Sequence, residues 1–214
     1  MTATKLSIYN GALLFIGERK ISALTDEIES RRLLDDVWDR DGVNNCLEQG
    51  QWNFAMRGAK LEYSPSITPA FGYTRAFEKP SDMLKLAALC SDEFFVAPLL
   101  DYSDEAGFWF CELDEIYIKY VSSDSSYGND YSLWPNSFTR YVEAYFGSQI
   151  VWKLTQNSTK EEAKKKEANK LLVQARSDDA MDSPTQFLPP GRWRQARSNW
   201  SGRRDRGNRG SLLG

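Results

Sequence analysis

The stretch PNSFTRYVEAYFGSQIVWKL, residues 135–154, decides the fold. Its large side chains recur three and four positions apart, which is the spacing of one face of an α-helix. That face comprises Phe138, Tyr141, Val142, Tyr145, Gln149 and Trp152. Because so many aromatic side chains on one face need apolar partners, the stretch predicts a helix that packs against other helices.

Three further helices are expected around it. Residues 4–16 repeat apolar side chains at helical spacing, and Gly17 is a natural left-handed terminator. A second helix is predicted over residues 27–47, and a last one follows residue 158 with a narrow apolar stripe. The predicted fold class is mainly α with a β insertion, in which residues 1–60 and 133–182 form a four-helix bundle core.

The middle of the chain differs in character. Residues 61–132 contain four prolines and several short aromatic runs, so a β-rich insertion between the two helix pairs is expected. The predicted strands are KLEYS (60–64), GYTRAF (72–77), EFFVAPLL (93–100), GFWFCEL (107–113) and EIYIKYV (115–121). In the last of these, Ile116, Ile118 and Tyr120 share one face. PSDMLKLAALC (80–90) begins with a proline and is predicted to form a short helical turn.

Composition excludes several classes of site. The chain has no histidine, the commonest general base and metal ligand, and its three cysteines are far apart without CxxC spacing. Carboxylates such as Asp36 and Asp39 crowd the helix expected over 27–47. They suit a metal site or a glycosidase pair, but a solvated acidic face is favoured. No enzymatic activity, catalytic residue, metal or cofactor is therefore expected.

Charge is distributed unevenly along the chain. Residues 191–214 carry seven arginines and one acid, a net of +6, whereas the rest carries 20 basic and 29 acidic residues, a net of −9; together they give −3. Three prolines between residues 184 and 190 exclude a helix or a central strand there. We expect residues 183–214 to form a basic C-terminal arm, disordered or extended in the isolated subunit. No apolar run approaches the ~20 residues that span a bilayer, so no membrane partner is expected.

The order of several motifs resembles the head-to-tail adaptor proteins of short-tailed phages, often called tail tubular protein A or gatekeeper-ring proteins. The resembling stretches span most of residues 10–155. They are NGALLFIGERKISALTDE (10–27), WDRDGVNNCLEQGQWNFAMRGAKL (38–61), YTRAFEKPSDMLKL (73–86), EIYIKYV (115–121) and LWPNSFTRYVEAYFGSQIVWKLT (133–155). The most specific parts are IGE (16–18) followed by ISALTD (21–26), QWNFA (51–55) with two later positions, and PSDML (80–84). Their most specific positions after residue 50 are Trp52, Asn53, Phe54, Ala55, Arg57, Leu61, Pro80, Asp82 and Leu84.

The resemblance implies a structural protein of the virion, assembled in the host cytoplasm and located at the head–tail junction of the tail. Family members form a ring of twelve subunits between the portal protein above and the tail nozzle protein below. Genomic DNA passes through the central channel without sequence-specific contact. The extended C-terminal segment reaches into the portal.

Two roles for the arm remain open on composition. As a nucleic-acid-binding module, its arginines would contact phosphates and its tryptophans would stack on bases. If the arm is a portal-docking peptide, its aromatic residues would anchor it in clefts of the portal, and its arginines would pair with acidic residues at the rims of those clefts. The acidic body and the resemblance favour portal docking. The expected docking residues are Phe187, Leu188, Arg192, Trp193, Arg194, Arg197, Trp200, Arg203 and Arg204.

Overall fold

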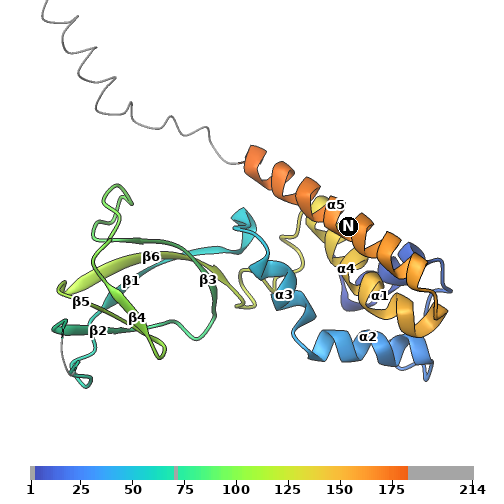
Figure 1. Cartoon of the computed structure of the whole chain (residues 1–214), viewed down its shortest axis with the longest axis horizontal. Helices are drawn as coiled ribbons and strands as arrows, with labels where there is room; N and C mark the ends of the chain where they lie inside the picture. Colours follow the sequence, from blue (N-terminus) through green and yellow to red (C-terminus); the bar gives the residue numbers. More distant parts are fainter. Residues whose placement is uncertain (1–2, 70–71, 183–214) are drawn as a thin grey trace, which may run out of the picture. The chain divides into compact units, whose positions relative to one another are not determined.

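The computed structural model describes residues 3–69 and 72–182. This part of the chain has five α-helices, one 3-10 turn (Asn53–Ala55) and six strands; Figure 1 shows how they are arranged. The helices are α1 (Lys5–Ile16), α2 (Glu29–Asp39), α3 (Gly42–Glu48), α4 (Asn136–Thr155) and α5 (Ser158–Asp182). The strands are β1 (Met56–Glu62), β2 (Arg75–Glu78), β3 (Met83–Cys90), β4 (Ser103–Glu105), β5 (Phe108–Cys111) and β6 (Glu115–Ser122). The arm residues named above lie outside the described residues.

The helices pack around α4. This helix contacts α1, α2, α3 and α5, and Phe138, Tyr141 and Val142 on its predicted face are buried. Gly147 allows α1 to approach closely, because a Cβ at this position would lie 2.9 Å from the carbonyl oxygen of Ala12. Trp152 departs from the prediction, with 44% of its surface exposed.

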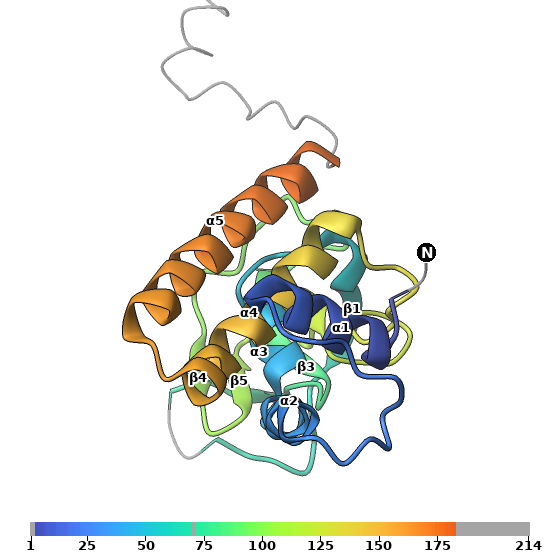
Figure 2. The ribbon, with the colours of Figure 1, turned by 90° about the vertical axis from the view of Figure 1, so that its right-hand side faces the viewer.

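The predicted four-helix bundle core is wrong. The helix expected over residues 27–47 is two helices, because Asp41 takes a left-handed conformation with φ 57° and ends the run between α2 and α3. The long α5 buries only Ala168 and Ala175, too narrow a stripe to line a bundle core. Figure 2 shows α5 as one long helix beside the others. The described residues form a mixed α/β fold, with five helices and two three-stranded antiparallel sheets.

Strand β6 connects two apolar cores. It is the central strand of the sheet β1-β6-β3, and the second sheet has the order β2-β5-β4. Its side chains alternate as predicted: Ile116, Ile118 and Tyr120 are buried in a cluster that both sheets share. Val121 points to the other side and belongs to the helical core. Met56 on β1 and Leu84 on β3 also pack against the helical core, so all three strands of this sheet attach it to the helices.

Two local predictions in the middle of the chain are wrong. Residues 80–90 make one turn, in which the Met83 amide donates to the Pro80 carbonyl, and then continue as β3. Residues 93–100 form a loop and not a strand. The carboxylate of Asp92 accepts hydrogen bonds from the backbone amides of Val96 and Ala97, which holds this segment in a turn that a strand cannot adopt.

Candidate functional site

Two of the three most specific resembling stretches meet in one cluster. Arg57 lies on β1 and Asp82 lies in the turn before β3, and Nη1 of Arg57 is 3.0 Å from Oδ2 of Asp82. Strand β6, which separates β1 from β3, adds two further donors to the same carboxylate. Tyr120 donates from its hydroxyl to Oδ1 at 3.1 Å, and Ser122 donates to Oδ2 at 2.5 Å. We call these four residues the Asp82 cluster.

Strand register places these side chains together. Arg57 lies opposite Tyr120 in the β1–β6 pair, and Met83, the residue after Asp82, lies opposite Ser122 in the β3–β6 pair. The Asp82 carbonyl also accepts a hydrogen bond from the Ser123 amide at 2.8 Å. Side chain and backbone of Asp82 are thus both bound to the end of β6.

The Asp82 carboxylate is held in its charged form. Burial by itself raises the pKa of Asp82, but hydrogen bonds from Ser122, Arg57 and Tyr120 outweigh burial and lower it below its usual value. Burial and the neighbouring Asp82 charge raise the pKa of the Tyr120 phenol to about 12. The phenol therefore stays protonated and remains a donor to Asp82 at neutral pH.

The residues before Arg57 attach the cluster to the helices. Trp52 is 1% exposed, and its indole Nε1 donates to the Leu47 carbonyl at 3.0 Å. The rings of Trp52 and Phe54 lie 4.7 and 4.9 Å from the ring of Phe138 on α4. Ala55 is fully buried in the same helical core.

Asn53 binds the last helix. Its backbone amide donates to the Asp179 carboxylate at 3.1 Å, and its side-chain amide donates to the Asp179 carbonyl at 2.8 Å. Asp179 lies near the end of α5, three residues before the described chain stops at Asp182. The stretch QWNFA therefore ties α5 to the start of β1.

A surface pocket of about 500 Å³ adjoins the Asp82 cluster. Arg57, Leu61, Pro80 and Asp82, four of the positions selected from the sequence, line it together with Tyr120. Leu84 lies elsewhere, packed against the helical core. The two charged residues among these positions, Arg57 and Asp82, form an ion pair with each other. This pairing favours a structural role for them over a catalytic one.

Two carboxylates of α2, Asp35 and Asp36, are also engaged in ion pairs. Asp35 pairs with Arg31 at 2.5 Å and accepts a hydrogen bond from the Tyr9 hydroxyl at 2.7 Å. Asp36 pairs with Arg40 at 3.0 Å. In the described part of the chain, no group of three or more cysteine or acidic side chains is arranged to hold a metal ion. The three cysteines, all described, are free and buried.

Some residues in or beside the Asp82 cluster, and the partner of Asn53, carry no sequence signal. Ser122 follows the apolar alternation of β6 as an ordinary polar residue, and Tyr127, whose ring lies 5.3 Å from the Arg57 guanidinium, sits in a polar loop. Tyr120 was expected only as a core residue. The contact of Asp179 with Asn53 spans 126 residues and has no local pattern.

Comparison with known protein families finds no family that matches this chain, and comparison with curated proteins finds no match. Within residues 3–69 and 72–182, none of the helices has the length and apolar character that crossing a bilayer needs.

Proposed function

We propose that this chain is a structural subunit of an adaptor ring at the head–tail junction of a short-tailed phage. The ring would join the portal above to the tail nozzle below and surround the channel through which DNA leaves the head. One observation carries the proposal. Two of the stretches on which the resemblance rests, QWNFA with Arg57 and PSDML, are far apart in sequence but joined by the Arg57–Asp82 ion pair.

The positions of the motif residues support a role in architecture. Trp52, Phe54 and Ala55 fill the helical core, Asn53 binds α5, and Arg57 and Asp82 join three strands. A protein at the head–tail junction bears mechanical force, so its helices and its sheet need to move as one unit. The motif residues join the helices to the sheet. The resemblance therefore rests on residues that organise the fold.

Charge supports the same proposal. The chain without residues 191–214 carries a net charge of −9, so a channel lined by it repels DNA weakly and lets it slide. The basic arm is proposed to dock into the portal through its aromatic residues and arginines. Arms from every subunit of a ring bind together, so modest single contacts give strong avidity.

Sedimentation of purified portal rings tests the proposal. Three proteins are compared: the full chain, the chain cut after Asp182, and a full-length variant with Phe187, Leu188, Trp193 and Trp200 changed to serine. The serine variant keeps every arginine, so it separates aromatic anchoring from charge alone. We expect only the full chain to co-sediment with portal at physiological salt.

Other outcomes have definite meanings. Binding by the truncated chain would move the portal contact to residues 1–182 and remove the docking role of the arm. Failure of all three proteins to bind would overturn the adaptor proposal. Retention of double-stranded DNA by the full chain, lost on truncation and weakened steeply by salt, would instead favour a nucleic-acid-binding arm.

A further inference from the structure

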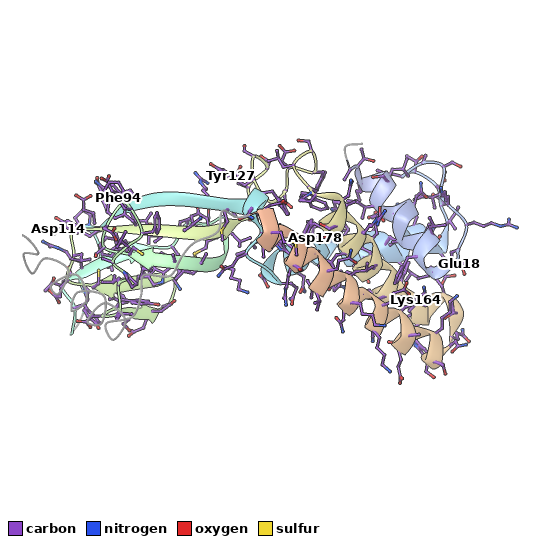
Figure 3. The ribbon with its side chains drawn as sticks, turned by 90° about the horizontal axis from the view of Figure 1, so that it is seen from above. Glu18, Phe94, Asp114, Tyr127, Lys164 and Asp178 are labelled. Carbon is purple, nitrogen blue, oxygen red and sulfur yellow. The ribbon has the colours of Figure 1, made fainter. Side chains whose placement is uncertain are left out.

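The loop between β3 and β4 exposes large apolar side chains. Phe94 is 77% exposed, Val96 is 79% exposed and Leu100 is 87% exposed. Figure 3 shows Phe94 at the surface near the strands. We call residues 93–100 the apolar loop. Clustered exposed apolar side chains are typical of a surface that another molecule covers.

The apolar loop is held by its own hydrogen bonds. Asp92 accepts from the amides of Val96 and Ala97 at 3.0 and 2.8 Å, and the Leu99 amide donates to the Leu89 carbonyl at 2.9 Å. Phe95 has φ 57°, a left-handed conformation that is unfavourable for a bulky residue. Because its backbone is already ordered, the loop loses little entropy when it binds.

The surroundings of the apolar loop are acidic. Residues 86–118 contain eight aspartates and glutamates and no lysine or arginine. Three of these acids, Asp104, Asp114 and Glu115, pair with Lys79, Arg75 and Lys60 from outside this range, which leaves a net charge of −5. An acidic rim repels nucleic acid and anionic lipid, and it also repels the same loop of another copy. The chemistry that fits is a protein socket with an apolar floor and basic side chains around it.

The helical part of the same chain carries such a socket. A pocket of about 340 Å³ between α2 and α4 is lined by the apolar side chains of Leu33, Val37 and Ile150 and by the basic side chain of Lys153. Arg40 and Asp36, which form an ion pair with each other, complete its charged lining. Residues 153–170, which continue from it into α5, contain six lysines and three glutamates, a net of +3. We call this pocket the α2–α4 socket.

We propose that the apolar loop of one copy inserts into the α2–α4 socket of the next copy. The two surfaces are unlike, so the contact is heterologous and repeats from copy to copy, as a ring requires. Apolar side chains would supply the affinity, and the opposite charges would set the orientation. This inference names the contact between neighbouring subunits of the proposed adaptor ring. It rests on that proposal for the assumption that the repeated contact closes into a ring.

Site-specific cross-linking tests the contact. Full-length Val96→Cys protein is mixed with full-length Gln149→Cys protein, with and without purified portal rings, and treated with a short bismaleimide. Gln149 is exposed and lines the socket, and the native Cys46, Cys90 and Cys111 are buried. The matched control replaces Gln149→Cys with Val173→Cys, a residue of α5 that is 64% exposed and does not line the socket.

We expect covalent dimers from the Val96–Gln149 mixture at a yield at least about tenfold above the control. Adding Phe94→Ser to the Val96→Cys protein is expected to remove this excess without changing the Tm, because Phe94 is exposed. Portal binding without the excess of dimers would overturn the loop–socket contact and leave the adaptor ring standing.

The remaining outcomes are equally decisive. Cross-linking without portal binding would support the contact and overturn the adaptor proposal. Flotation of the protein with phosphatidylcholine vesicles, abolished by Phe94→Ser and without specific cross-links, would make the loop a membrane contact and overturn the inference.

Discussion

Arg57 on β1 and Asp82 before β3 form an ion pair of 3.0 Å although β6 lies between their strands. The pair closes over the end of the middle strand, where Tyr120 and Ser122 donate to the same carboxylate. From this position we expect Asp82 to stabilise the sheet and its attachment to the helices.

Replacing Asp82 by asparagine removes the negative charge and turns one of the two acceptor oxygens into a donor. We expect Asp82→Asn to lower the free energy of unfolding by about 1–2 kcal/mol, because charge-assisted hydrogen bonds are lost while the pair with Arg57 is partly exposed to solvent. Urea unfolding followed by circular dichroism measures the effect. Glu93→Gln, an exposed position in the apolar loop, is the control and should change stability little. Equal effects of the two variants would contradict the assignment.

The same carboxylate makes stability depend on pH. The pKa of Asp82 is lower in the folded chain than its usual value, so its contribution is fully present above the unfolded pKa, near 3.9, and is lost as pH falls through the folded pKa. We expect the difference in unfolding free energy between wild type and Asp82→Asn to be constant from pH 7 to 5 and to shrink below about pH 4. A difference that does not change on acidification would show that the folded pKa is not lowered.

Trp52 and Trp152 provide a matched pair of tryptophans. Trp52 is 1% exposed and packs on Phe138, whereas Trp152 is 44% exposed. We expect Trp52→Ala to cost about 4 kcal/mol through the cavity that it leaves, and Trp152→Ala to cost about 1 kcal/mol or less. Thermal or chemical unfolding of both variants measures this. A larger cost for Trp152→Ala would mean that the assignment of core and surface faces of α4 is wrong.

Glu143 is a carboxylate packed closely against α1. Burial raises its pKa, and Arg140 offsets this only in part. A Cβ on Gly11 would lie 2.1 Å from the Glu143 side chain, so the carboxylate occupies the space beside that glycine.

A raised folded pKa means that stability is greatest below the unfolded pKa and is lost as pH rises through the folded one. We expect Glu143→Gln to raise the Tm at pH 7 by about 2–4 °C and to have no effect near pH 4, where the wild-type carboxyl is protonated. Differential scanning calorimetry at pH 7 and pH 4 measures the two Tm values. An increase in Tm that persists at pH 4 would show that the substitution acts through packing and not through the charge of Glu143.

Local patterns were enough for several elements. Gly17 ends α1 in a left-handed conformation with φ 85°, as predicted, because a glycine at the end of an apolar helical repeat is a local signal. The predicted alternation of buried and exposed side chains in β6 was also correct, because a period of two residues can be recognised from neighbouring residues alone. The helix over residues 135–154 was predicted nearly to its observed ends, Asn136 and Thr155.

Of the candidate site, sequence reasoning identified members but not their contacts. Arg57 and Asp82 were selected from different stretches, and no spacing rule indicated that their side chains would pair. Asp179, Tyr127 and Ser122 were missed, because each is an ordinary polar residue until a distant partner lies beside it.

By itself, therefore, the sequence determined where α1, α4 and β6 form and which faces of α1, β6 and the first half of α4 turn inward, because helix and strand periods act over a few residues. Only the tertiary structure decided that residues 27–47 break at Asp41, that β6 lies between Arg57 and Asp82, and that EFFVAPLL is an exposed loop. An apolar run reads the same in a buried strand and in an exposed loop. Whether such a run is buried or exposed depends on which distant elements pack over it, and the packing of the whole chain decides this.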